Sequence, residues 1–87
     1  MIVKICGITN ERDLSMAIDL GYTMAGFVQY RQSKRYIEKE KAIKLINLAK
    51  SKIKTVAVGL TFKDVEDLYN IVDYIQIYEP YGSDKLI

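Results

Sequence analysis

The only cysteine of the chain, Cys6, closes a short apolar stretch and directly precedes Gly7. Residues 3–6 are expected to form a strand, which places the thiol at the strand's carboxyl end. Parallel α/β folds carry their chemistry at that end of their strands. A thiol there can act as a nucleophile or a base, whereas the commoner role of a free cysteine is to pack as a small apolar side chain. Cys6 is therefore the candidate catalytic residue.

Lys4 lies two residues earlier, so its side chain is expected to point to the same side of the strand as Cys6. Its charge can favour the thiolate or bind a substrate anion. Equally, Lys4 can form a structural ion pair or lie in solvent. The chain has no histidine, which excludes His-based triads and makes most zinc sites implausible. We therefore expect no metal site, and proton transfer must use cysteine, carboxylate, lysine or tyrosine groups.

Length and charge narrow the remaining possibilities. The 87 residues, 49% hydrophobic and 28% charged, are enough for one small folded domain. The net charge of +2 comes from lysines spread along the chain, which gives nucleic-acid binding little support. No stretch resembles a membrane span or a signal peptide, and a single cysteine suits a reducing compartment. These features predict a cytoplasmic protein that binds neither membranes nor nucleic acid.

Strand-like and helix-like segments alternate along the chain. Apolar residues recur with helical spacing in three segments, and Asn10 is a plausible N-cap of the first. The expected strands cover residues 3–6, 24–28, 54–60 and 74–78, and the expected helices cover 10–20, 38–52 and 61–71. This βαβαβαβ order predicts a parallel sheet with right-handed crossovers. Residues 79–87 have no evident partner within the chain.

Side-chain direction along the strands refines the predicted architecture. Ile5 and Ile75 are expected on one face of the sheet, and Lys4, Cys6 and Gln76 on the other. An open sheet covered by helices on both faces would be apolar on both. A sheet with helices on one face and polar groups on the other resembles the wall of a barrel. The fold class is therefore α/β, with four parallel strands and three helices that make residues 1–87 a single, partial (β/α)8-barrel domain.

Several motifs, in order, resemble those of the phosphoribosylanthranilate isomerases, which are TIM (β/α)8 barrels. The opening motif is the most specific, and the later ones gain weight from their order and spacing. The similar segments are Lys4-Ile5-Cys6-Gly7-Ile8-Thr9, Arg12-Asp13, Gly21, Ala25-Gly26-Phe27-Val28, Ser33-Lys34-Arg35, Val56-Ala57-Val58-Gly59-Leu60 and Ile75-Gln76-Ile77. The resemblance thus covers nearly the whole chain and assigns it to the N-terminal half of the barrel.

The resemblance implies an Amadori rearrangement of N-(5-phosphoribosyl)anthranilate to 1-(2-carboxyphenylamino)-1-deoxyribulose 5-phosphate in tryptophan biosynthesis, without a cofactor. In the family, the cysteine of the opening motif is the general base, which maps to Cys6. Arg35 matches an arginine that contacts the anthranilate end of this phosphosugar substrate. Gln76 can bind substrate, together with Lys4, or simply satisfy Lys4. Tyr78 stands where the family usually has histidine.

The family's general acid and phosphate site lie in the second half of its barrel, so this chain is expected to carry half of a site. The outer edges of the first and fourth strands are expected to be open. Self-association, association with a C-terminal half-barrel, or marginal stability should follow. Two alternatives are a non-catalytic, self-associating half-barrel and a flavodoxin-like α/β ligand-binding module, although Gly7-Ile8-Thr9-Asn10 is not a glycine-rich phosphate loop.

Overall fold

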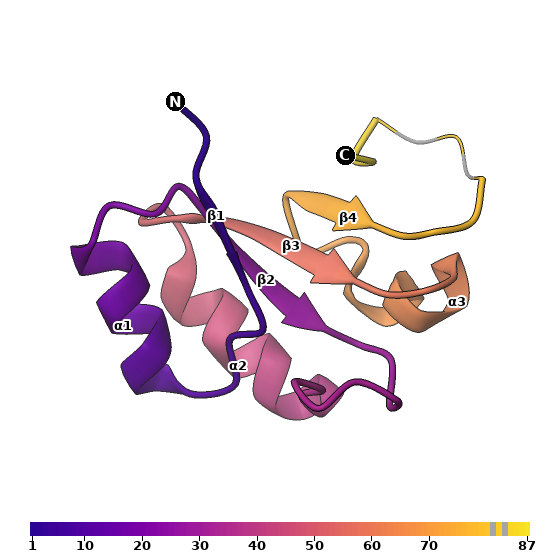
Figure 1. The fold of residues 1–87 in the computed structure, drawn as a ribbon, viewed down its shortest axis with the longest axis horizontal. Coiled ribbons are helices and arrows are strands. Elements are labelled where there is room, and N and C mark those ends of the chain that lie inside the picture. The colour runs from indigo at the N-terminus through magenta and orange to yellow at the C-terminus, as the bar shows by residue number, and fades with distance from the viewer. Residues whose placement is uncertain (81, 83) are drawn as a thin grey trace.

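The computed structural model describes residues 1–80, 82 and 84–87, and the strands within them form one parallel sheet (Figure 1). The strands are β1 (Lys4–Cys6), β2 (Met24–Val28), β3 (Lys54–Val58) and β4 (Tyr74–Gln76), and the helices are α1 (Glu11–Asp19), α2 (Lys39–Ala49), α3 (Phe62–Val65) and a 3₁₀ turn, η1 (Glu66–Leu68). The predicted βαβαβαβ order is confirmed. The sheet order β1-β2-β3-β4 excludes a flavodoxin-like arrangement, whose first strand lies inside the sheet.

The first helix begins where its sequence predicts. The Asn10 side chain accepts a hydrogen bond from the backbone N–H of Asp13 at 2.8 Å, which makes Asn10 the N-cap of α1. At the start of α3, the Asp64 carboxylate accepts from the backbone N–H of Leu60 at 2.9 Å and of Thr61 at 3.1 Å. The bonds to Asp13 and Thr61 satisfy N–H groups that a helix start leaves without partners, and the bond to Leu60 holds the residue before the N-cap of α3.

Two predicted helices end earlier than expected. The second stops at Ala49 instead of residue 52, because Lys50 is extended and Ser51 has a φ of 62°, and this turn directs the chain into β3. The third gives way to a 3₁₀ turn after Val65 instead of continuing to residue 71. Turn-type hydrogen bonds follow, from the N–H groups of Ile71 and Val72 to Leu68 O at 3.0 and 3.1 Å, and the N–H of Asp73 then donates to Thr55 O of β3 at 3.1 Å.

The two faces of the sheet differ as the side-chain alternation predicts. Figure 1 shows the helices on one side of the sheet. The strand residues that pack under them form part of the larger buried cluster, namely Ala25, Phe27, Ala57 and Ile75, and the partly buried Ile5 packs against it. The opposite face carries a smaller cluster made of Met24, Val28, Val56 and Val58, with Cys6, Tyr30 and Tyr74 packed against it. No helix within the described residues is long and apolar enough to cross a membrane.

The C-terminal residues have a partner, contrary to the sequence-based prediction. Leu86 forms an isolated parallel bridge with Ile75 of β4. The N–H of Ile75 donates to Lys85 O at 2.9 Å, and the N–H of Ile87 donates to Ile75 O at 3.1 Å. The outer edge of β4 is therefore covered at Ile75, contrary to the prediction. Among residues 1–80, 82 and 84–87, no strand or bridge pairs with the outer edge of β1, as predicted.

Candidate active site at the carboxyl ends of the strands

Cys6 is the last residue of β1, and its side chain is partly buried on the face of the sheet away from the helices. The N–H groups of Gly7 and Ile8 both donate to Gly26 O, at 3.0 and 3.1 Å, which fixes the end of the strand against β2. Gly26 is also the register partner of Cys6. A Cβ added at Gly26 would lie 3.3 Å from the cysteine Sγ. The absence of a side chain at Gly26 therefore leaves the thiol room on this face.

Sequence reasoning did not identify Gly26 as part of the site, although a signal was present. A glycine within an otherwise apolar strand often marks a close approach of a ligand or another group. Here the group that approaches is the thiol of the neighbouring strand. Because Gly26 is in register with Cys6, any side chain at this position would project beside the sulfur.

Arg35 lies against the same strand end. A Cβ built on Gly7 would lie 2.4 Å from Arg35 Cδ and 3.2 Å from its Cβ and Cγ, so the aliphatic stem of the arginine occupies the space over the glycine. Gly7 has a φ of 89°, a conformation that L side chains rarely adopt. The glycine that follows Cys6 is thus required both for the turn and for the approach of Arg35. The structure thus places Arg35 against the residue that follows Cys6.

The loop that carries Arg35, residues 29–37, is tied to the strands by Gln29, which sequence reasoning also missed. The Gln29 side-chain amide donates to Ile37 O at 2.8 Å and to Val28 O at 3.1 Å, and its backbone N–H donates to Val58 O at 2.7 Å. One glutamine thereby joins the two ends of the loop. The backbone N–H of Arg35 is further held by the Ser33 hydroxyl at 3.1 Å.

Lys4 and Gln76 meet across the face of the sheet, where the Lys4 ammonium donates to Gln76 Oε1. Their strands, β1 and β4, are the outer two of the sheet, about 14 Å apart if the sheet were flat. The two residues are also offset along the strands. Lys4 is level with Lys54 of β3, whereas Gln76 is level with Val58, four residues further along that strand. The contact therefore requires a curved sheet whose outer strands turn their side chains toward each other, as in a barrel wall. Of the alternatives for Gln76, the structure contains the bond that satisfies Lys4.

Beyond Gln76, the side chains of Tyr78 and Glu79 hold the segment that follows β4. The Gln76 side-chain amide N–H donates to the Tyr78 hydroxyl at 3.4 Å. Because lysine can only donate, Gln76 must turn its oxygen toward Lys4 and its NH₂ toward Tyr78. Glu79 accepts from the backbone N–H of Phe62 at 2.7 Å and so binds the end of β4 to the start of α3.

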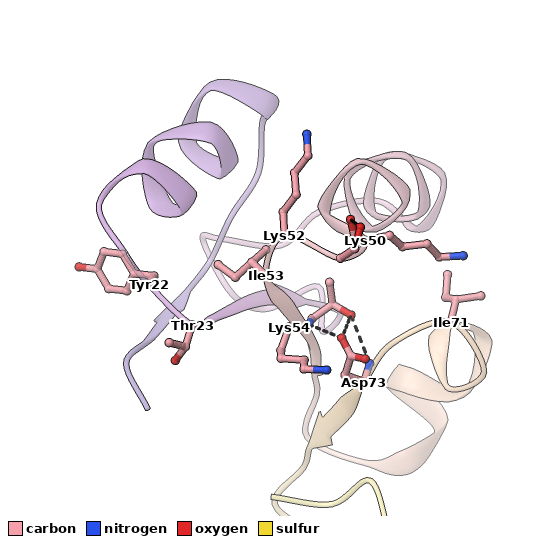
Figure 2. Close-up of a pocket in the computed structure, with 10 residues that line it drawn as sticks. Tyr22, Thr23, Lys50, Lys52, Ile53, Lys54, Ile71 and Asp73 are labelled. Carbon is pink, nitrogen blue, oxygen red and sulfur yellow. Dashed lines mark hydrogen bonds between the residues drawn. The ribbon is translucent and has the colours of Figure 1, made fainter. Parts of the chain in front are cut away.

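A cavity of about 380 Å³ lies at the amino ends of the strands, opposite the candidate site (Figure 2). Its polar anchor is Asp73, whose carboxylate accepts from the N–H of Thr55 at 2.8 Å and from its hydroxyl at 3.2 Å. Figure 2 shows the side chains of Lys50, Lys52 and Lys54 pointing in different directions. These lysines therefore do not converge on a common ligand, and the role of Asp73 is to bind β4 to β3.

Substituting Gly7 by alanine should weaken both the fold and the placement of Arg35. The positive φ costs about 1–2 kcal/mol for an L-residue, and the new Cβ must displace the Arg35 stem. Gly21→Ala is the matched control, because Gly21 has a φ of 88° but nothing within 4 Å of an added Cβ. Urea unfolding should show the larger loss for Gly7→Ala. Equal losses for the two variants would argue against the packing of Arg35 on Gly7.

Comparison with known proteins gives one consistent result. No protein-family model matches the chain. Several N-(5'-phosphoribosyl)anthranilate isomerases are similar to it in sequence. The isomerase from Trichlorobacter lovleyi is 40% identical over 70 residues, which cover 80% of this chain and 33% of the relative. The one from Sulfurihydrogenibium sp. is 38% identical over 86 residues, 97% of this chain and 42% of the relative. The one from Thermoanaerobacter pseudethanolicus is 46% identical over 75 residues, 86% of this chain and 36% of the relative.

Solved structures agree with the sequence matches. The phosphoribosylanthranilate isomerase of Thermotoga maritima superposes with a TM-score of 0.81 and 32% identity, over 92% of this chain and 42% of that protein. The chain is related to the phosphoribosylanthranilate isomerases. The isomerase from Thermus thermophilus has a TM-score of 0.80 at 31% identity, with 92% of this chain and 43% of that protein covered.

The chain spans less than half the length of these phosphoribosylanthranilate isomerases. The predicted relationship and the predicted half of a (β/α)8 barrel are thereby confirmed. Cys6, Arg35, Gln76 and Lys4 stay candidate site residues, now with defined neighbours.

Proposed function

We propose that this chain supplies the N-terminal half of a phosphoribosylanthranilate isomerase site. The reaction is the Amadori rearrangement of N-(5-phosphoribosyl)anthranilate, with Cys6 as the general base. The observation that carries the proposal is the juxtaposition of Cys6, at the carboxyl end of β1, with Arg35, whose stem packs over the next residue, Gly7. Residues 1–87 act in this proposal as one partial barrel domain.

The chemistry requires one acid and one base. Protonation of the ribose ring oxygen opens the ring and gives a Schiff base between C1 and the anthranilate nitrogen. The Cys6 thiolate then takes the proton from C2, and the C–H electrons form a C1=C2 double bond while the nitrogen receives the C=N electron pair. Tautomerisation of this enolamine, with protonation at C1 and loss of the proton from the C2 hydroxyl as the C2=O bond forms, gives the aminoketose. A general base of this kind contributes about 10²–10⁴-fold to the rate.

Arg35 and Lys4 have separate roles in the proposal. The Arg35 guanidinium binds the anthranilate carboxylate, since arginine pairs with carboxylates through two parallel hydrogen bonds. Packing of its stem on Gly7 and the Gln29 amide bonds at the ends of its loop support this placement. The Lys4–Gln76 pair provides a positive charge on the face that carries Cys6. The Gln76 amide also donates a hydrogen bond to the Tyr78 hydroxyl.

In this proposal, four further strands complete the eight-stranded barrel. A C-terminal half-barrel or a second copy of this chain would pair with the free edge of β1, and only the former is expected to bring the general acid and the phosphate site. The substrate is a small phosphosugar, with no role for nucleic acid or a membrane, and no cofactor takes part. A cytoplasmic location belongs to the same proposal, because one free thiol suits a reducing compartment.

The test is turnover in a complemented barrel. Loss of substrate fluorescence would be followed with the 87-residue chain alone and then with a separately produced C-terminal half of the Thermotoga maritima isomerase. We expect no turnover from either half alone and measurable turnover from the mixture. If both halves are folded and associated but no product forms, the catalytic proposal is wrong, and a non-catalytic half-barrel becomes the better description.

A further inference from the structure

The outer edge of β4 is occupied by the chain itself, in the manner of a parallel strand. The N–H and C=O of Ile75 point outward from the sheet. The N–H donates to Lys85 O at 2.9 Å, and the C=O accepts from the N–H of Ile87 at 3.1 Å. Figure 1 shows the chain turning back after β4 so that its end lies beside this strand. In a closed barrel this edge pairs with the next strand. Residues 85–87 therefore stand where another strand would pair.

A lysine anchors this segment. The Lys85 ammonium donates to Tyr69 O at 2.5 Å and to Val72 O at 3.0 Å, and it lies 4.8 Å from the centre of the Tyr69 ring. Leu86 adds one apolar side chain against the larger core cluster. Within the described residues, the contacts of this segment centre on the Lys85 ammonium and on the two backbone hydrogen bonds with Ile75, and a longer strand could replace the latter.

At the opposite edge of the sheet, β1 presents backbone hydrogen-bonding groups to its outer side. The Val3 carbonyl and the Gly7 N–H bond to β2, so the backbone groups of Lys4 and Cys6 point to the outer edge, as the alternation of a parallel strand dictates. No ladder or bridge within the described residues involves this edge. A hollow of about 170 Å³ adjoins it, and the side chains of Met16 and Leu20, 51% and 71% exposed, contribute to its lining.

We propose that residues 85–87 form a displaceable cap on β4 that competes with β1 of a second copy of this chain. Both occupants run parallel to β4, so a copy's β1 would continue the sheet in the same sense. Two such contacts related by a two-fold axis join eight strands, the number that closes a (β/α)8 barrel. The inference deepens the self-association considered above and identifies its two edges and its switch.

The test compares variants of the cap in the full 87-residue chain. Lys85→Met removes the ammonium but keeps the length of the side chain, and Ile87→Pro removes the N–H that bonds to Ile75 O. Ile87→Ala is the matched control, since it keeps that N–H. Hydrogen bonds to charged groups contribute about 1.5–3 kcal/mol each, so Lys85→Met should form dimers at a concentration at least about tenfold lower than the parent chain. Light scattering across a concentration series measures this.

Hydrogen exchange identifies the partner edge. In the dimer, the amides of Lys4 and Cys6 should exchange more slowly than in the monomer, because they now pair with β4 of the other copy. Equal self-association of parent and cap variants overturns the proposal, as does a dimer in which these two amides are unprotected. Displacement of the cap only by an added C-terminal half-barrel overturns the choice of a second copy. None of these readouts uses substrate. A failure of the catalytic proposal would therefore leave this inference intact, and a failure of this inference would leave the catalytic proposal intact.

Discussion

Replacing Cys6 with alanine should lower turnover in the complemented barrel by about 10²–10⁴-fold, the usual contribution of a positioned general base. The loss should fall on kcat, because the thiol acts on the C2 proton while the carboxylate end of the substrate is held by Arg35. The fold should tolerate the change. Cys6 is only partly buried and lies at the end of its strand, beside a glycine.

Cys6→Ser is the matched control for this prediction. Serine preserves the shape of the side chain but replaces a thiol with a hydroxyl, which is a far weaker acid. Serine should therefore be nearly as inactive as alanine. Activity that survives in the serine variant but not in the alanine variant would show that the position needs a polar group and not a thiolate. Association of each variant with the C-terminal half should be measured alongside, so that a loss of assembly is not mistaken for a loss of chemistry.

Phe27→Ala should produce the largest loss of stability. Phe27 is fully buried in the cluster under the helices and is in register with Ala57. Truncating a buried phenylalanine costs about 3–5 kcal/mol, against a total stability of about 5–15 kcal/mol for small domains. In an 87-residue chain most of the stability should therefore disappear. Urea unfolding followed by circular dichroism measures the effect.

Two further variants keep the Phe27 prediction informative if the alanine variant fails to fold. Phe27→Leu should lose less than about 1.5 kcal/mol, because a large apolar side chain is retained. Leu48→Ala, at a residue 47% exposed on α2, should change the unfolding free energy by less than about 0.5 kcal/mol. A Phe27→Ala midpoint close to that of the parent chain would mean that the cluster is not the centre of the fold.

The fold could be predicted from the sequence where the local side-chain pattern agrees with the tertiary packing. The alternation of Lys4 and Cys6 against Ile5 correctly separated the two faces of the sheet, because a strand has a side-chain period of two. Helix ends were predicted less well. The third helix gives way to a 3₁₀ turn after Val65, although the apolar spacing predicts a helix up to residue 71.

The residues of the candidate site remain predictions, and the structure adds contacts that the sequence did not predict. Cys6 and Arg35 were identified from a motif, whereas the packing of Arg35 over Gly7 depends on the path of a loop between them. Gln29 was missed because a single glutamine after a strand has no distinguishing pattern. The pairing of residues 85–87 with β4 was missed for a similar reason, since a three-residue parallel bridge gives no periodic signal.

Protection of the Cys6 thiol by the reaction product tests the central claim most directly. The chain has a single cysteine, so the rate of its alkylation by iodoacetamide, followed by mass spectrometry, reports on one position. In the complemented barrel, saturating 1-(2-carboxyphenylamino)-1-deoxyribulose 5-phosphate should slow the reaction several-fold, and Arg35→Met should weaken that protection. Alkylation at an unchanged rate, under conditions in which the product demonstrably inhibits turnover, would show that the site lies elsewhere.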